Sequence, residues 1–225
     1  SAEEAGGNPR WREIFIADID LDIAVNFNHG QVVVHRQQPR DRQAPWQRVI
    51  LCDGEQKLLP IAQWPKPADP FYPDLPADFL QSPNRLEVRD GRTRLVDTKN
   101  LAGKDAKFFE GMFVGVHGGN NHTYFAAVTG FEPAKSELQF APFKDTTYPT
   151  TRFALYNSPR LIEQPGEWAI APTGAGRTRI WLLADRLQNG QPDNIGFPEL
   201  ETGIAITDGA SHLRVQGFLI QRFSG

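Results

Sequence analysis

Two histidines frame a short polar turn near the middle of the chain. The segment His117–His122 reads His-Gly-Gly-Asn-Asn-His and lies between the apolar segments 112–116 and 123–129. Imidazole and amide groups donate and accept hydrogen bonds in fixed directions, which suits recognition of a sugar or a metal ion. A plain hairpin turn explains the same residues, because glycine and asparagine tolerate positive φ angles. No third zinc ligand is evident nearby, so we expect no metal. The candidates for glycan binding in this turn are His117, Asn120, Asn121 and His122.

A second group of candidates consists of aromatic residues in a proline-rich segment. Trp64, Phe71 and Tyr72 lie within or beside a series of prolines that extends over 65–83. Proline fixes φ and lacks a backbone donor, so this segment cannot be a central strand. Exposed aromatic rings stack against the apolar faces of sugars, as they also anchor interfaces. Either these three rings form a carbohydrate platform, or they fold back as a lid over the core.

Two glutamates are candidates for acid–base chemistry. Glu167 lies in a Pro-Gly-Glu-Trp turn, and Glu110 precedes an apolar segment. Glycoside hydrolysis needs two carboxyl groups about 5 Å or roughly 6.5–9.5 Å apart, a separation that a sequence does not contain. A hydrogen bond within the turn or between strands is the simpler role for Glu167. If the chain is itself an enzyme, its acid and base come from Glu110, Glu167, His117 and His122.

Alternating carboxylates mark one segment near the N-terminus. Asp18, Asp20 and Asp22 alternate with apolar residues over 15–25, which predicts a strand with one apolar and one acidic face. Clustered carboxylates can hold calcium. A solvated face that discourages edge-to-edge pairing is the simpler interpretation, because the glycine and spacing of a calcium loop are missing. The single cysteine, Cys52, ends an apolar segment and is expected to be buried rather than nucleophilic.

Nearly every apolar segment alternates with a period of two residues and stops at glycine, proline, asparagine or aspartate. This pattern is typical of short β-strands, and no segment shows the periodicity of a long helix. We therefore expect an all-β fold, a sandwich or barrel-like domain, with one helical turn at Pro76–Leu80. The expected strands cover 15–25, 31–36, 48–52, 57–61, 85–89, 93–97, 112–117, 123–130, 137–141, 168–171, 178–183, 203–207 and 213–221.

Composition restricts the class of protein and of partner. The chain has 225 residues, of which 40% are hydrophobic and 23% charged, as is ordinary for a globular protein that folds without disulfides. The net charge of −3 argues against nucleic acid, because phosphate binding requires an excess of lysine and arginine. No apolar run approaches the roughly 18 residues of a membrane span, so a membrane is not an expected partner.

The chain divides into four parts by composition. Residues 1–10 are small and polar, which predicts a flexible N-terminus. Residues 11–186 hold most of the expected strands and form the β-rich domain. Residues 187–201 are rich in glycine, proline and asparagine and are expected to be a linker. Residues 202–225 contain two short strands joined by a corner, a rhythm similar to one coil of a parallel β-helix. A solenoid needs about three repeats, so this coil would begin a longer structure.

Three segments carry a likeness to a known group of proteins: Val49–Pro65 (VILCDGEQKLLPIAQWP), Tyr156–Ala171 (YNSPRLIEQPGEWAIA) and Gly203–Gly225 (GIAITDGASHLRVQGFLIQRFSG). They resemble bacterial proteins with a right-handed parallel β-helix of the pectate-lyase-like type. Many members of that group are glycoside hydrolases or polysaccharide lyases. Gln63 stands here where arginine is common in the group, and the shared motifs are structural rather than catalytic.

The resemblance implies a β-rich accessory domain that caps the first coil of a β-helix and shapes or binds a glycan. Capping covers backbone groups that an open coil would expose. The group's catalytic acids usually lie on later coils, outside this chain. Two alternatives stay open: a free-standing glycan-binding module, and an autonomous polysaccharide hydrolase or lyase. The expected partner is a polysaccharide or oligosaccharide, with no cofactor, in a secreted or periplasmic protein that could self-associate through its C-terminal strands.

Overall fold

The computed structural model describes residues 1–19, 23–28, 31–36, 47–48, 51–52, 57–70, 75–119, 122–142, 148–174, 176–193 and 195–196. Within these residues the regular elements are β-strands and four single 3₁₀ turns, so the chain is all-β, as the sequence predicts. The paired strands form several antiparallel sheets, and the described strands close no barrel. Residues 202–225, which include the expected β-helix coil, lie outside the described part of the chain.

Many predicted segments match an element, with several corrections. Strands β7, β8, β14, β17 and β18 have no predicted counterpart, and the expected strand over 48–52 is two strands, β4 and β5, in different sheets. The expected strand over 15–25 is two strands, β1 and β2, which belong to different sheets. The turn η1 confirms the helical turn expected at Pro76–Leu80. The strands are β1 (Ile14–Ile19), β2 (Ile23–Asn28), β3 (Gln31–Arg36), β4 (Gln47–Arg48), β5 (Leu51–Cys52), β6 (Leu58–Leu59), β7 (Gln63–Trp64), β8 (Leu80–Ser82), β9 (Glu87–Arg89), β10 (Arg92–Val96), β11 (Phe113–Gly119), β12 (His122–Glu132), β13 (Glu137–Phe140), β14 (Thr151–Tyr156), β15 (Trp168–Gly174), β16 (Arg177–Leu183), β17 (Leu187–Gln188) and β18 (Gln191–Pro192). The 3₁₀ turns are η1 (Pro76–Asp78), η2 (Ala106–Phe109), η3 (Pro133–Lys135) and η4 (Pro159–Leu161).

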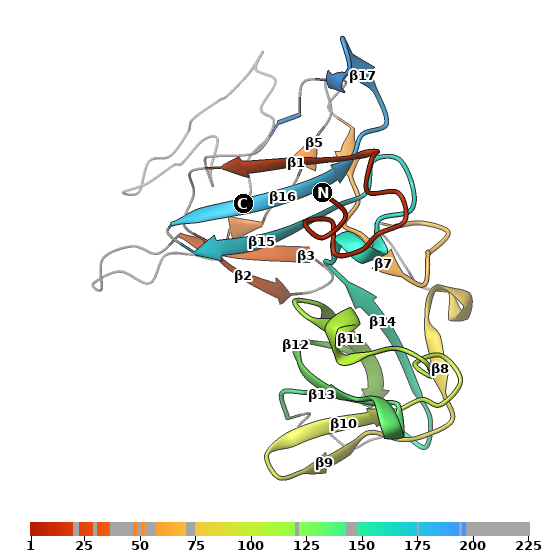
Figure 1. The fold of residues 1–225 in the computed structure, drawn as a ribbon. Coiled ribbons are helices and arrows are strands. Elements are labelled where there is room, and N and C mark those ends of the chain that lie inside the picture. The colour runs from red at the N-terminus through yellow and green to blue at the C-terminus, as the bar shows by residue number, and fades with distance from the viewer. Residues whose placement is uncertain are drawn as a thin grey trace, which may run out of the picture.

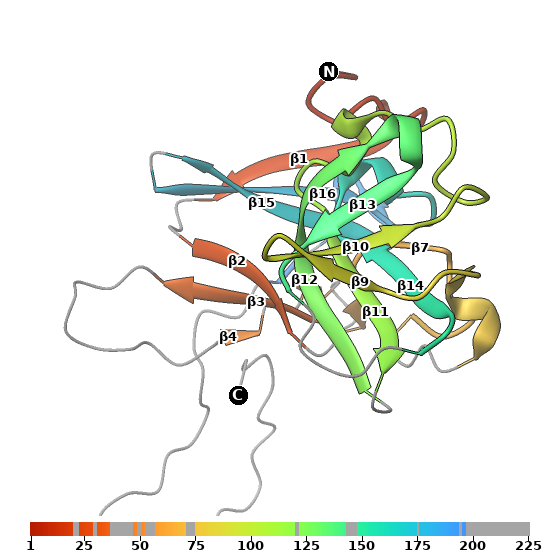
Figure 2. The same cartoon turned by 90° about the horizontal axis from the view of Figure 1, so that it is seen from below.

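The largest sheet has eight strands. Their order is β7-β14-β11-β12-β13-β10-β9, with β8 beside β14. Strand β12 is 11 residues long and pairs first with β11 and then with β13. The register with β13 shifts between Val128 and Gly130, and such irregularities bend a strand. Figure 2 shows how the sheet curls from β14 round to β9.

Two smaller sheets form the other part of the molecule (Figure 1). One has the order β1-β16-β15 and the other β2-β3-β4. Strand β2 contacts both β15 and β12, so it lies between the small sheet and the large one. Strand β14 points from the large sheet toward this second part of the molecule, so it connects the two parts.

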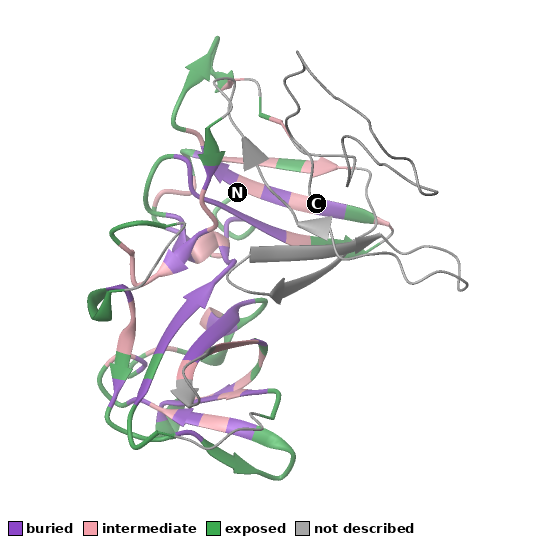
Figure 3. Cartoon of the chain, turned by 180° about the vertical axis from the view of Figure 1, so that it is seen from behind, coloured by how far each residue is buried: buried purple, intermediate pink, exposed green. Residues whose placement is uncertain are grey.

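Strand β14 separates two apolar cores. Phe153 and Leu155 point into one core, and Ala154 and Tyr156 point into the other. From Phe153 to Tyr156 both faces of the strand are therefore dry, and Figure 3 shows the strand largely buried. The first core includes Leu95, Phe109, Met112, Phe131, Leu138 and Phe140 of the large sheet and its turns, and it extends to Ile14, Ala169 and Leu183 of the small sheet. The second lies against the small sheet and includes Phe113, Trp168, Ile170, Ile180 and Leu182.

Gly115 allows two rings to close over strand β11. The rings of Phe125 and Tyr156 pack edge to face with their centroids 5.8 Å apart. A Cβ atom on Gly115 would lie 2.5 Å from Cε1 of Phe125 and 3.0 Å from Cε2 of Tyr156. Real Cβ atoms do not approach carbon this closely, so the packing of these rings requires glycine.

Two of the segments that resemble the β-helix proteins pack against each other. The indole Nε1 of Trp168 donates to the carbonyl of Leu59 at 2.7 Å, and the amide of Ala62 donates to the carbonyl of Trp168 at 2.7 Å. Asn157 has a positive φ of 62°, and its side chain exchanges two hydrogen bonds of 2.9 Å with the backbone of Ile170. These bonds join the end of β14 to β15, so these two segments form the junction of the two parts.

The N-terminal residues, for which composition predicts a flexible end, pack against the body of the molecule. Ala5 is fully buried, and the indole of Trp181 donates to the carbonyl of Glu4 at 2.7 Å. The buried side chain of Asn8 donates to the carbonyls of Pro159 and Ile162 at 2.6 and 2.8 Å. These contacts fix the start of the chain beside η4.

The expected linker begins with a small hairpin. Strands β17 and β18 pair only with each other among the described strands, and Leu187 is 56% exposed. The described part of the chain contains no helix of the length and apolar character that a membrane crossing needs.

Candidate functional site

Trp64 lies at the end of the short strand β7, at the start of the proline-rich segment. Its register partner in β14 is Leu155, so its side chain is on the same face as the first core. The indole is half-buried and contacts the ring of Phe108 edge to face, with the centroids 6.4 Å apart. Phe108 belongs to η2, which the carboxylate of Asp105 caps by accepting from the Phe108 amide at 2.7 Å.

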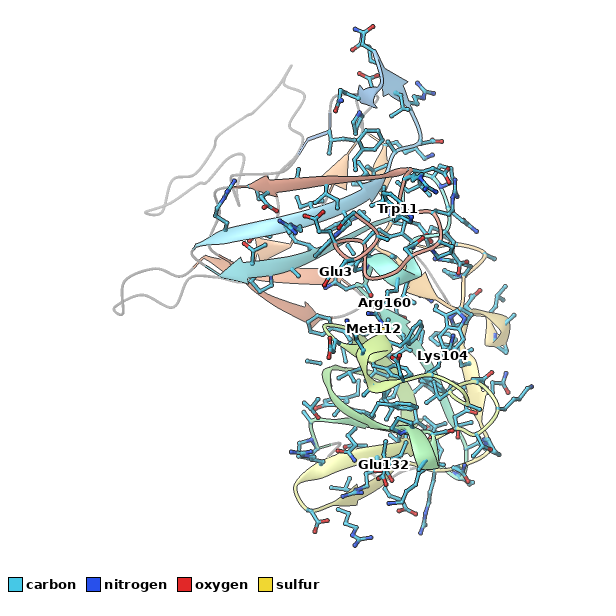
Figure 4. All side chains as sticks on the ribbon, in the orientation of Figure 1. Glu3, Trp11, Lys104, Met112, Glu132 and Arg160 are labelled. Atoms are coloured by element: carbon cyan, nitrogen blue, oxygen red, sulfur yellow. The ribbon has the colours of Figure 1, made fainter. Side chains whose placement is uncertain are left out.

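Lys104 adds a positive charge to these two rings. Its Nζ atom lies 4.4 Å from the ring centroid of Phe108 and 5.6 Å from that of Trp64. Within the described ranges, no carboxylate or other acceptor lies within bonding distance of this ammonium group. Figure 4 shows Lys104 near the place where the two parts of the molecule meet. We call Trp64, Phe108 and Lys104 the aromatic–lysine cluster.

Asp78 fixes the backbone next to this cluster. Its buried carboxylate accepts hydrogen bonds from the amides of Ala68 at 3.0 Å and Leu75 at 2.8 Å, on either side of 69–74. Its own carbonyl accepts from Nε2 of Gln63 at 3.4 Å. One carboxylate therefore closes the base of the proline-rich loop. Phe71 and Tyr72, the other two predicted platform residues, lie outside the described residues.

The phenol of Tyr156 lies near Asp78 in the second core. Burial raises the pKa of Tyr156 above its ordinary value, and the charge of Asp78 raises it further. The phenol therefore stays protonated beyond the range in which an exposed tyrosine ionises.

A row of polar side chains crosses the opposite face of the large sheet. His117 in β11 lies directly opposite Arg152 in β14, and Arg152 lies directly opposite Gln81 in β8. Directly opposed residues of antiparallel strands point to the same face. The ring of Tyr148 lies beside that of His117, with the centroids 5.9 Å apart. We call these four residues the polar row.

The structure does not bring the predicted glycan-binding residues into one site. Trp64 is on the face of the first core, whereas His117 is on the face of Ala154 and Tyr156. His122 begins β12 and pairs with Gly119 at the tip of the predicted hairpin. Asn120 and Asn121, at the centre of that turn, lie outside the described residues.

Glu167 is tied into the turn in which it lies. Lys66 Nζ contacts its two carboxylate oxygens at 2.7 and 2.8 Å and also donates to the carbonyl of Leu161. Oε2 of Glu167 accepts from the amides of Glu163 at 2.7 Å and Gln164 at 3.0 Å. This arrangement is that of a carboxylate that stabilises a turn. Glu110 is exposed and directly follows η2, in a different region of the chain.

Asp18 pairs with an arginine on the neighbouring strand. Its oxygens accept from Nε and Nη2 of Arg179 at 2.6 and 2.8 Å, and this bonding lowers the pKa of Asp18. Asp20 and Asp22 lie outside the described residues, so only Asp18 of the three alternating carboxylates is described. Within the described ranges, no three histidine, cysteine, aspartate or glutamate side chains group as metal ligands do. The side chain of Cys52 also lies outside the described part.

Sequence reasoning missed the residues that stand beside its candidates. Lys104 and Phe108 flank Trp64, and Arg152 and Gln81 flank His117. None of these four belongs to a motif. A signal existed only for Phe108, because an aspartate three residues before it marks the start of a turn.

Comparisons with known proteins add one weak structural match. No family model matches the sequence, and no curated protein matches it. Among solved structures, a chain described as "Glycoside hydrolase" aligns with a TM-score of 0.43 at 14% identity. The alignment covers 81% of this chain and 32% of that one, so this chain spans about a third of that protein's length. A match at this level establishes neither a shared fold nor a shared activity.

Proposed function

We propose that this chain is a β-rich accessory domain that binds a glycan within a larger carbohydrate-active protein. The observation that carries the proposal is the aromatic–lysine cluster. Trp64 presents part of its indole at the surface, next to the edge of Phe108 and the ammonium group of Lys104. An apolar ring face beside a charged donor matches a pyranose, which has C–H faces and a rim of hydroxyl groups.

The surroundings of the cluster support a preformed site. Phe108 is held by the capped turn η2 and contacts Phe109, which is fully buried in the first core. Trp64 is held by pairing with β14. A ring that is already fixed loses little conformational entropy when a ligand binds.

The alternative of an autonomous hydrolase or lyase has less support. Both oxygens of Glu167 are engaged by Lys66 or by backbone amides, which favours a structural role. Capping of a β-helix, as the resemblance implies, is compatible with glycan binding and is part of the same proposal.

Trp64→Ala tests the proposal directly. We expect the chain to bind at least one of four neutral soluble polysaccharides, namely xylan, galactomannan, hydroxyethyl cellulose or dextran, in affinity electrophoresis and calorimetry. Trp64→Ala should weaken that binding by about tenfold or more, as expected when a central aromatic anchor is lost. Lys104→Ala, which leaves the core intact, should weaken it to a smaller extent.

The chain provides a matched control. Trp11 is also half-buried and also carries a cation, with Arg12 4.5 Å from its ring centroid, but it lies in the N-terminal segment. Trp11→Ala should leave glycan binding unchanged. Equal losses in Trp11→Ala and Trp64→Ala, or no binding to any of the four polysaccharides, would contradict the proposed function.

A further inference from the structure

We propose that the polar row, formed by His117, Arg152, Gln81 and Tyr148, is a second binding site that takes the carboxylate or sulfate group of an anionic saccharide. It lies on the opposite face of the large sheet from Trp64, and no part of the argument depends on the aromatic–lysine cluster.

The first step is geometric. His117, Arg152 and Gln81 occupy three neighbouring strands at one register level, so their side chains form a straight line across the sheet. Two inter-strand spacings give the row a length of roughly 10 Å, enough for a short saccharide. Arg152 and Gln81 are exposed, Tyr148 is 38% exposed, and His117 is half-buried. The row is therefore accessible from solvent.

The second step is that Arg152 lacks a counter-charge. Two arginines in the sheets are paired with acids: Arg94 with Glu137 at 2.9 Å, and Arg179 with Asp18 at 2.6 Å. In the described part of the chain, no acidic group lies within ion-pair distance of Arg152. A guanidinium group presents parallel N–H donors that match the two oxygens of a carboxylate or sulfate. The row thus offers a planar cation at its centre.

The third step concerns the groups beside Arg152. The rings of His117 and Tyr148 are tilted by 45° to each other and stand at one end of the row. At the other end, Nε2 of Gln81 donates to the carbonyl of Pro76 at 3.4 Å, which orients the amide. Rings and amides bind the C–H faces and hydroxyl groups of sugars. Flanking groups of this kind favour a saccharide over an acidic peptide or a free ion.

Matched pairs of polymers separate the effect of charge on affinity from the effect of the sugar backbone. Carboxymethyl cellulose and hydroxyethyl cellulose share one backbone, as do dextran sulfate and dextran, and each pair differs in charge. We expect the chain to bind at least one anionic polymer more tightly than its neutral partner, with an affinity that falls as salt rises. The pair that shows the difference identifies the anion as carboxylate or sulfate.

Arg152→Gln assigns the binding to the row. It should lower the affinity for the anionic polymer by about tenfold or more, the effect of losing one charged hydrogen-bonding group. Tyr148→Ala should also lower it. Arg89→Gln, which removes an exposed arginine on strand β9, is the matched control and should have no effect. Trp64→Ala should leave the difference between each charged polymer and its neutral partner unchanged.

Several results would overturn the assignment. Equal affinity for charged and neutral polymers would do so and would leave the proposed function at Trp64 intact. Equal losses in Arg152→Gln and Arg89→Gln would show that only net charge matters. Binding of polyglutamate with the same affinity and the same loss in Arg152→Gln would assign the row to acidic polypeptides instead.

Discussion

Glu167 and Lys66 form an ion pair that is almost removed from solvent. The exposed fractions of the two side chains are 7% and 17%. Burial of two charges is costly, and it is offset here by hydrogen bonds from two backbone amides to the carboxylate and from Lys66 to a carbonyl. The pair holds the turn between η4 and β15 against the start of the proline-rich segment. Its effect is therefore on the position of Trp64, two residues before Lys66.

Glu167→Gln tests this role. Glutamine has a similar size but leaves Lys66 without a counter-charge in a nearly dry site, so we expect the free energy of unfolding to fall by about 2–4 kcal/mol. Urea denaturation measures the change. Glu132→Gln removes a carboxylate from an exposed pair with Lys135 and should cost less than about 1 kcal/mol.

Two results would refute the structural role of Glu167. One is a Glu167→Gln variant as stable as the parent chain. The other is a polysaccharide-cleaving activity that Glu167→Gln abolishes while stability is unchanged, because that would make the carboxylate catalytic.

The sequence predicts some residues of the candidate sites but not the residues that complete them. Trp64 and His117 can be recognised because a tryptophan among prolines and histidines around a glycine turn are unusual residue types in unusual places. Lys104 and Arg152 are ordinary surface residues by type. Their interest comes from neighbours far apart in sequence, such as Trp64 for Lys104, and a single sequence holds no record of such proximity.

Strands with one buried and one exposed face were easier to predict from the sequence than strands buried on both faces. Strands β3, β10 and β16 each show a period of two residues or a valine-rich run, and all were expected. Strand β14 was not, although it pairs with β7, β8 and β11 in the large sheet. Its residues from Phe153 to Tyr156 are all buried, on alternating faces, so its sequence shows no alternation between polar and apolar residues. A strand that is buried on both faces over these residues thus has little periodic signal.

A single glycine controls how β11 packs beneath the second core. Gly115→Ala would place a methyl group within 3.0 Å of two rings, and both rings are held by surrounding side chains. We expect a loss of about 1–3 kcal/mol in the free energy of unfolding, the usual effect of adding an atom to a filled core. Thermal and urea denaturation would measure it.

Gly130→Ala is the control for the effect of replacing a glycine by alanine where no ring is in the way. Gly130 lies in the same sheet, and a Cβ atom there would meet only the flexible side chain of Gln139, at 3.4 Å. This variant should be neutral or slightly stabilising, because alanine lowers the entropy of the unfolded chain. Equal effects of the two substitutions would mean that the rings above Gly115 can move aside.

At the scale of the whole molecule, the N-terminal segment joins elements that are distant in sequence. Glu4 accepts from the indole of Trp181 through its carbonyl, and its carboxylate lies 3.5 Å from Arg179. Asn8 binds the turn η4. Composition alone predicts a flexible end here, since the segment has no apolar periodicity. Its order depends on hydrogen bonds from individual polar groups, which composition does not reveal.

Asn8→Ala tests whether these bonds stabilise the whole fold. The substitution would remove the amide donor that the carbonyls of Pro159 and Ile162 share, so we expect the free energy of unfolding to fall by about 1–3 kcal/mol. Asn84→Ala removes an exposed amide that donates to the carbonyl of Val96 at 3.0 Å, and it should cost clearly less. Hydrogen exchange distinguishes a local effect on the N-terminal segment from an effect on the whole fold. If Asn8→Ala speeds exchange only within residues 1–13, the segment is an appendage, whereas faster exchange in β15 and β16 would show that it supports the junction that positions Trp64.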